Sequence, residues 1–89
     1  MKEDAFKSLR EKLELQEWPG QYMYKFIFKG DNRKIALIEK EFDDAAQIDI
    51  KTSSKGKYVS ITVKENANSA GEIIQKYMEI SKIEGVMML

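Results

Sequence analysis

The sequence contains no cysteine and no histidine among its 89 residues. The chain can therefore form no disulfide, no thiolate nucleophile and no cysteine–histidine zinc site, and it has no imidazole to act as a base near neutral pH. Fifteen lysine and arginine residues balance fifteen aspartate and glutamate residues, so no net charge attracts the chain to nucleic acid or anionic lipid. These absences predict a protein that is not an enzyme, holds no cofactor or metal, and binds no nucleic acid.

Long apolar runs are also missing, since no segment approaches the roughly 20 apolar residues of a membrane span. The N-terminal residues Met1 to Asp4 are largely charged and lead into an amphipathic pattern, unlike the apolar core of a secretion signal. We therefore expect a cytoplasmic protein that does not contact a membrane. With 43% hydrophobic and 34% charged residues, the composition is typical of one small globular domain.

Proline occurs once, and it divides the chain. Residues 4–16 have the pattern of an amphipathic helix, which Trp18-Pro19-Gly20 ends because proline restricts the preceding residue and glycine permits a sharp turn. We expect residues 1–19 to form this helix and its turn, and residues 20–89 to form the main domain. The apolar side chains at helical spacing in the first segment are Phe6, Leu9 and Leu13.

The main domain alternates strand and helix patterns. Side chains alternate at period 2 in the strands, and apolar residues recur every three or four positions in the helices. The order β-α-β-β-α-β predicts an α+β, ferredoxin-like sandwich: a four-stranded antiparallel sheet with two helices on one face and the first and third strands central. The expected strands are 22–29, 47–52, 58–64 and 86–89, and the helical stripes are Ile35, Ile38 and Phe42, then Ile73, Tyr77 and Ile80.

Two helix starts are visible in the sequence. Asp31 or Asn32 can cap the first helix of the main domain, because both side chains accept hydrogen bonds from free backbone N–H groups. Ser69 and Glu72 match the capping box of the second helix, with Asn68 as a rival cap.

The first strand has two different faces. Tyr22, Tyr24, Phe26 and Phe28 point to one side, which we expect to pack under the helices, and the tyrosine hydroxyls, with that of Tyr77, are expected at the rim of the core. The other face of the sheet is expected to be open and to carry an apolar patch with a polar rim, which usually marks a contact surface. The patch residues are Met23, Ile27, Met87 and Leu89.

Two alternatives are expected for this patch. In the first, the N-terminal helix folds back over it with Phe6, Leu9 and Leu13, at little entropic cost because the helix is already tethered. In the second, the open face pairs with a second copy or with another protein.

The turn between the second and third strands is the one candidate ligand site. Ser53, Ser54, Lys55 and Gly56 could hold a small anion through turn amides and the lysine, whereas the alternative is a polar hairpin with glycine at the position of unusual φ. Lys55-Gly56 also begins the pattern of RNA-binding strands, but the residues that follow lack its aromatics. An acidic cluster lacks calcium-loop spacing and is read as a solvated helix end; its members are Glu39, Glu41, Asp43 and Asp44.

Three stretches together resemble the YbeD-like family of small bacterial proteins. These are Leu15 to Pro19 before Tyr22 to Lys25, the turn and strand from Thr52 to Val63, and the ending from Tyr77 to Leu89. The resemblance covers the chain after about Lys12 and implies a ferredoxin-like fold. The family carries the label of lipoate regulatory proteins and is compared with ACT-type ligand-sensing domains. It implies no catalytic residues.

We therefore expect a non-enzymatic regulatory or protein-interaction module of the bacterial cytoplasm. The alternative is an ACT-like sensor of a small anionic metabolite, which binds at the Ser53–Gly56 turn.

Overall fold

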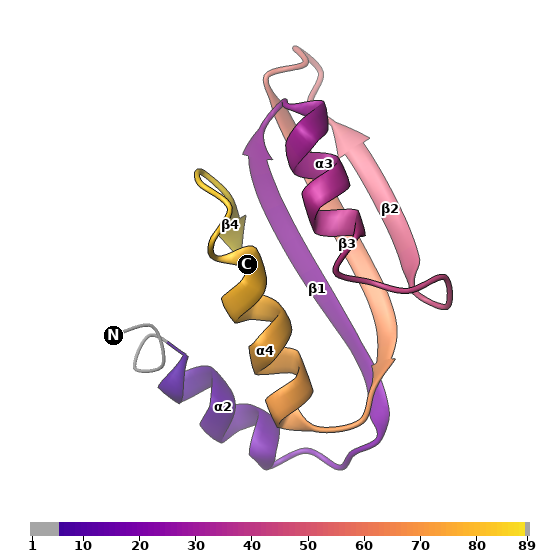
Figure 1. Ribbon diagram of the computed structural model, residues 1–89, viewed down its shortest axis with the longest axis vertical. Coiled ribbons are helices and arrows are strands. Elements are labelled where there is room, and N and C mark those ends of the chain that lie inside the picture. Colours follow the sequence, from indigo (N-terminus) through magenta and orange to yellow (C-terminus); the bar gives the residue numbers. More distant parts are fainter. Residues whose placement is uncertain (1–5, 89) are drawn as a thin grey trace.

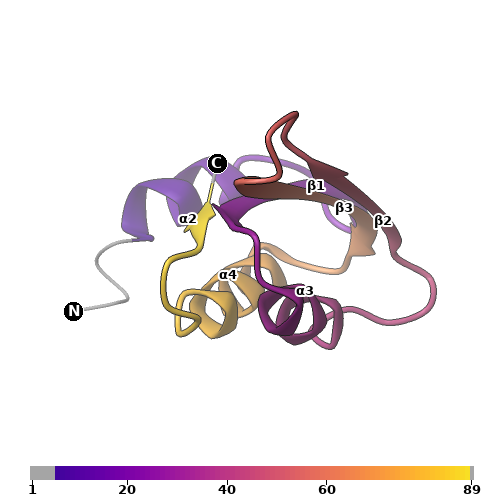
Figure 2. The same ribbon diagram turned by 90° about the horizontal axis from the view of Figure 1, so that it is seen from above.

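The computed structural model describes residues 6–88 and shows a four-stranded sheet with the strand order β2-β3-β1-β4. All neighbouring strands are antiparallel. Helices α3 and α4 cover one face of the sheet (Figures 1 and 2), which confirms the predicted α+β, ferredoxin-like arrangement. In chain order the elements are α2 (Lys7–Glu14), β1 (Gly20–Lys29), α3 (Asn32–Glu39), β2 (Gln47–Thr52), β3 (Tyr58–Ala67), α4 (Ala70–Ile80) and β4 (Met87–Met88).

The core lies between the two central strands and the helices. Alternation along β1 turns its aromatic side chains inward, as predicted, and Phe26 sits directly opposite Ile61 on β3 with both side chains fully buried. The buried helix residues close the core from the other side. They are Ile38 on α3, and Ala70, Ile73, Ile74, Tyr77 and Ile80 on α4.

Both predicted helix starts are present. The Asp31 side chain accepts a hydrogen bond from the Arg33 backbone N–H at 2.9 Å, so Asp31 is the cap of α3. Ser69 caps α4 by accepting from the Glu72 N–H at 3.2 Å, and the Glu72 carboxylate in turn accepts from the Asn68 N–H at 3.0 Å. The return bond of the capping box therefore reaches the residue before the cap.

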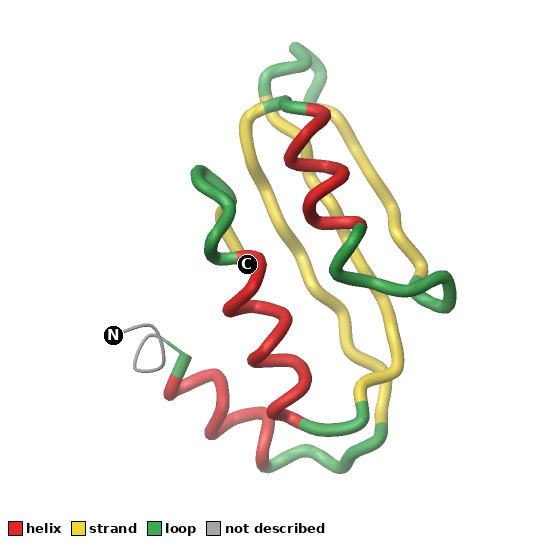
Figure 3. Tube along the Cα trace, viewed as in Figure 1, coloured by secondary structure: helices red, strands yellow, loops and turns green. Residues whose placement is uncertain are grey.

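Several boundaries differ from the sequence prediction, and β1 begins at Gly20, two residues before the predicted start. β3 continues to Ala67, three residues beyond the predicted end, because Gly20 and the residues after it on β1 pair with this extension. α3 ends at Glu39, so Phe42 packs against the core from the following turn instead of from the helix. β4 is only a short segment that follows a loop (Figure 3), and Leu89 lies outside the described residues.

The prediction that the N-terminal helix covers the open sheet face is wrong. Leu13 of α2 is buried in the main core, and the ring of Phe6 stacks on Tyr77 of α4 with 6.1 Å between centroids. Trp18 fixes the end of the helix by donating its indole N–H to the Leu13 carbonyl at 2.8 Å. α2 therefore lies at the β4 side of the molecule, next to α4 (Figures 1 and 2), and fills the corner that the short β4 leaves uncovered.

Within residues 6–88, no helix is long and apolar enough to cross a membrane. Among these described residues, no three acidic side chains come together as a candidate metal site. The cluster of Glu39, Glu41, Asp43 and Asp44 therefore does not form one.

Candidate interaction site on the open sheet face

The face of the sheet opposite α3 and α4 is built by the strand registers. In antiparallel strands, directly opposed residues point to the same side, so the pairing of Ile27 with both Ser60 and Met87 places all three on the open face. The same register fixes the remaining members. They are Gln21, Met23, Lys25 and Lys29 on β1, Gln47, Asp49 and Lys51 on β2, and Tyr58, Thr62, Lys64 and Asn66 on β3.

Two methionines form the exposed apolar part of this face. Met23 is 53% exposed and Met87 is 54% exposed, and Ile27 lies beside Met87 and is half-buried. A shallow depression of about 360 Å³ adjoins Met23; it is lined by Met23, Gln47, Ile48, Asp49, Thr62 and Lys64. The structure therefore brings together three of the four predicted patch residues, and the fourth, Leu89, is not among the described residues.

The open face is basic although the chain as a whole is neutral. Lys25, Lys29, Lys51 and Lys64 all occupy open-face positions, against the single carboxylate of Asp49. None of these lysines forms an ion pair within the described residues. The sequence analysis did not predict this excess of positive charge. The alternation along the strands nevertheless indicates it, because every lysine within the predicted strands falls at a position whose side chain points to the open face.

The predicted anion turn is held by its own hydrogen bonds. The Ser53 backbone N–H donates to the Tyr58 carbonyl at 2.8 Å, and the Ser53 hydroxyl oxygen accepts from the Tyr58 N–H at 3.1 Å. The Gly56 N–H donates to the Ser53 carbonyl at 2.8 Å, and Gly56 has the positive φ of 70° that the hairpin needs. Ser54 and Lys55 take part in no hydrogen bond within the described residues, whereas the Lys57 carbonyl accepts from the Gly30 N–H at 3.0 Å.

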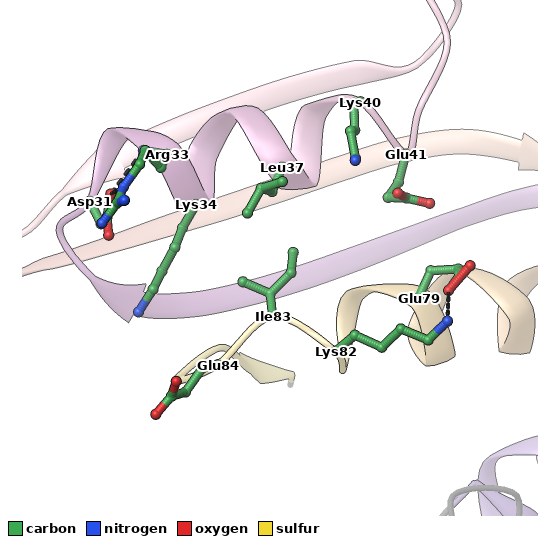
Figure 4. Close-up of a pocket in the computed structure, with 10 residues that line it drawn as sticks. All are labelled: Asp31, Arg33, Lys34, Leu37, Lys40, Glu41, Glu79, Lys82, Ile83 and Glu84. Carbon is green, nitrogen blue, oxygen red and sulfur yellow. Dashed lines mark hydrogen bonds and ion pairs between the residues drawn. The ribbon is translucent and has the colours of Figure 1, made fainter.

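A larger groove of about 600 Å³ lies between α3 and the end of α4 (Figure 4). Leu37 and Ile83 face each other across it, and Arg33 pairs with Asp31 at 3.7 Å. Four cationic and four anionic side chains balance in its lining, so the groove has no preference for a ligand of one sign. The residues come from two distant parts of the sequence: Asp31, Arg33, Lys34, Leu37, Lys40 and Glu41, and Glu79, Lys82, Ile83 and Glu84.

A buried tyrosine cluster lies under the sheet. The hydroxyls of Tyr22 and Tyr77 are 3.0 Å apart and share a hydrogen bond. Tyr24 is fully buried, so the expectation that its hydroxyl reaches the rim is wrong. The Tyr24 hydroxyl and one carboxylate oxygen of Glu65 are both buried without a hydrogen bond of normal geometry. Neither hollow described above is lined by these residues, so we read the cluster as packing.

Burial controls the ionisation of this cluster. Removal from water raises the pKa of Tyr24, to which the neighbouring Glu65 carboxylate adds. Burial, followed by the hydrogen bond with Tyr22, raises the pKa of Tyr77 in the same direction. Both phenols are therefore held in the neutral form.

We expect these raised pKa values to destabilise the protein in alkali. An unfolded tyrosine ionises at about pH 10, so the stabilisation from the neutral phenols is complete below that pH and is lost progressively above it. Tyrosinate absorbance at about pH 11 should stay below that of four ionised tyrosines while the far-UV circular dichroism is native. Full tyrosinate absorbance before unfolding would contradict this interpretation.

Comparison with known proteins identifies the family. Residues 13–89 match a family described as "Protein of unknown function (DUF493)". A UPF0250 protein of Shewanella oneidensis is 33% identical over 79 residues, covering 82% of this chain and 88% of the relative. A UPF0250 protein of Shewanella woodyi is similar to the same extent, 33% over 79 residues.

A solved structure supports the fold independently of the close relatives. The solution structure of protein HP0495 from H. pylori superposes with a TM-score of 0.65 at 19% identity, covering 83% of this chain and 85% of that one. At that identity the likeness concerns the fold alone. The match over residues 13–89 and the UPF0250 relatives confirm the YbeD-like resemblance, and the chain belongs to the DUF493 family of small bacterial proteins of unknown function.

Proposed function

We propose that this protein is a non-enzymatic regulatory module of the bacterial cytoplasm that binds another protein through its open sheet face. The partner segment presents apolar side chains to Met23, Ile27 and Met87, and carboxylates to the surrounding lysines. The observation that carries this proposal is the pair of methionines, each more than half exposed, on a face that also holds four lysines against one aspartate.

The energetics favour a partner on this face. Covering an exposed methionine removes apolar surface from water, at about 25 cal/mol per Å². Methionine suits such a role because its flexible thioether side chain adapts to irregular partners. The lysines add charge complementarity, which speeds encounter and selects acidic partners more than it adds affinity.

A second copy is a poor fit to the same face. Stacking two open faces would place four lysines of one chain against four of the other, with one aspartate each. Like charges brought together across an interface are unfavourable, and this cost opposes a face-to-face dimer.

Nucleic acid also fits the face poorly. Sheet surfaces that bind single strands stack bases on aromatic side chains of their central strands. Tyr58 is the one aromatic residue that the described strands present on the open face, and the middle positions of β1 on that face hold Met23, Lys25 and Ile27.

Affinity capture with matched variants tests the proposal. Immobilised wild-type protein is compared with the double variant Met23→Ser/Met87→Ser and with Lys25→Glu, and the proteins retained from a bacterial extract are identified by mass spectrometry. We expect one acidic partner that neither variant retains. Salt should weaken its binding to the wild type, because salt screens exposed charges with a Debye length of about 8–10 Å.

The control is Lys40→Ser, which removes a lysine from the α3–α4 groove and leaves the open face unchanged. A partner that both open-face variants still retain, and that Lys40→Ser fails to retain, contradicts the proposal. The anion-sensor alternative is separated by titrating the protein with phosphate and with a dicarboxylate. Amide shifts confined to Ser54, Lys55 and Lys57 would favour the sensor over the interaction module.

A further inference from the structure

The outer edge of β2 is the feature that the proposed function does not use. In the sheet order β2 is terminal, so its backbone pairs with β3 on one side only. No other element lies beside it in Figure 1. An edge strand of this kind offers a row of free N–H and C=O groups to another strand.

The hydrogen bonds of the hairpin show which backbone groups face outward. The Ser53 N–H donates to the Tyr58 carbonyl, so Ser53 points its backbone groups toward β3. Hydrogen-bonding direction alternates along an antiparallel strand. Asp49 and Lys51 therefore bond to β3 as well, and the groups of Ile48, Ile50 and Thr52 face outward. Ile50 is also 40% exposed, on the helix side of the sheet.

Charge is distributed along this edge in a self-complementary way. Asp43 and Asp44 precede β2, and Lys55 and Lys57 follow it. An antiparallel partner strand that is a second copy of β2 therefore brings the acidic end of each chain next to the basic end of the other.

The two charged residues inside β2 then select a register. A two-fold axis perpendicular to the sheet keeps both open faces on the same side, and one residue then pairs with itself. If that residue is Asp49 or Lys51, like charges oppose each other. If it is Ile50, Asp49 of each copy lies opposite Lys51 of the other, which is the favourable arrangement for a cross-strand pair.

We propose that two copies of this protein pair through the outer edges of β2, antiparallel and centred on Ile50, to form one continuous sheet. The backbone groups of Ile48, Ile50 and Thr52 then bond to the second copy. The two Ile50 side chains meet on the helix side, and the two Asp49–Lys51 pairs form on the open side. This inference does not depend on the proposed function, because the open face stays free in such a dimer.

Charge reversal at the edge tests this arrangement. The mass in solution is measured by sedimentation over a concentration series that reaches about 1 mM. The wild-type protein should approach twice the 10.3 kDa of one chain. Asp49→Lys and Lys51→Asp should each weaken association on the order of tenfold or more, since each converts both cross-strand pairs to like charges.

The two single variants also test each other. Neither associates well with itself, but their equimolar mixture should form a heterodimer, because the two lysines of one chain then face the two aspartates of the other. The double variant Asp49→Lys/Lys51→Asp should associate as the wild type does. Amide exchange gives a second readout on the unmodified chain, and Ile48, Ile50 and Thr52 should become protected as concentration rises.

The outcomes that overturn the inference are equally specific. A wild-type protein that keeps the mass of one chain throughout the series overturns it, as does a dimer that survives both single variants or a mixture that does not associate. If Lys25→Glu abolishes the dimer while Asp49→Lys and Lys51→Asp leave it intact, the contact lies on the open face instead.

Discussion

Replacing Phe26 with alanine should lower the free energy of unfolding by about 3–5 kcal/mol, the range for a buried phenylalanine. Phe26 is fully buried at the centre of β1, where it pairs with Ile61 on one side and Met88 on the other. Its ring packs 6.1 Å from that of Tyr24 and 6.2 Å from that of Tyr77. The substitution leaves a cavity among rigid aromatic neighbours that cannot collapse to fill it.

The loss is a large share of the total, because small domains are stable by only about 5–15 kcal/mol. Chemical denaturation followed by circular dichroism measures it as a shift in midpoint. Met23→Ala is the matched control, since it removes a large side chain from the same strand but from the exposed face. We expect it to cost less than about 1 kcal/mol. Equal losses for the two variants would mean that the two faces of β1 are assigned the wrong way round.

The faces of the sheet are predictable because backbone geometry dictates them. Successive side chains of a strand point to opposite sides, so four aromatic residues at period 2 from Tyr22 to Phe28 can be buried together in only one way. The same alternation identified β2 with the correct bounds, and it placed Met23, Ile27 and Met87 on the open face. These predictions need only local information.

Predictions that depend on distant partners were less successful. β3 was expected to end at Lys64, yet the strand continues to Ala67 where the start of β1 pairs with it. The α3–α4 groove is assembled from residues 31–41 and 79–84, and no single segment carries a signal for it. Long-range pairing, not local propensity, decides both features.

The position of α2 is the clearest such case. An amphipathic stripe shows that a helix needs an apolar surface, but two surfaces were available: the methionine patch on the open face, and the corner formed by Tyr22 and Tyr77. The corner offers the ring of Tyr77, which stacks on Phe6, and the Trp18 indole N–H donates to the carbonyl of Leu13 and holds the helix end there. The contact of Phe6 with Tyr77 joins residues far apart in the sequence, and no local pattern reveals that they meet.

Leu13→Ala should therefore behave as a core substitution and cost about 2–5 kcal/mol, although the residue lies outside the βαββαβ unit. Leu13 is 1% exposed and belongs to the main hydrophobic cluster, so its removal opens a cavity in that cluster. A helix that lay loosely on the surface would lose far less. Thermal and urea unfolding of the variant, followed at the tryptophan fluorescence and by circular dichroism together, measure the effect.

Leu15→Ala is the matched control in the same segment, because Leu15 is 88% exposed and its loss should change stability by no more than about 0.5 kcal/mol. Leu15 follows the last residue of α2 and its side chain faces solvent, whereas Leu13 lies within the helix and is buried. If both variants unfold at the same temperature and urea concentration as the wild type, α2 does not contribute to the core. If Leu13→Ala changes the fluorescence transition before the circular dichroism transition, α2 detaches as a separate unit while the sheet remains folded. A single shared transition shows that the N-terminal helix and the sheet form one cooperative domain.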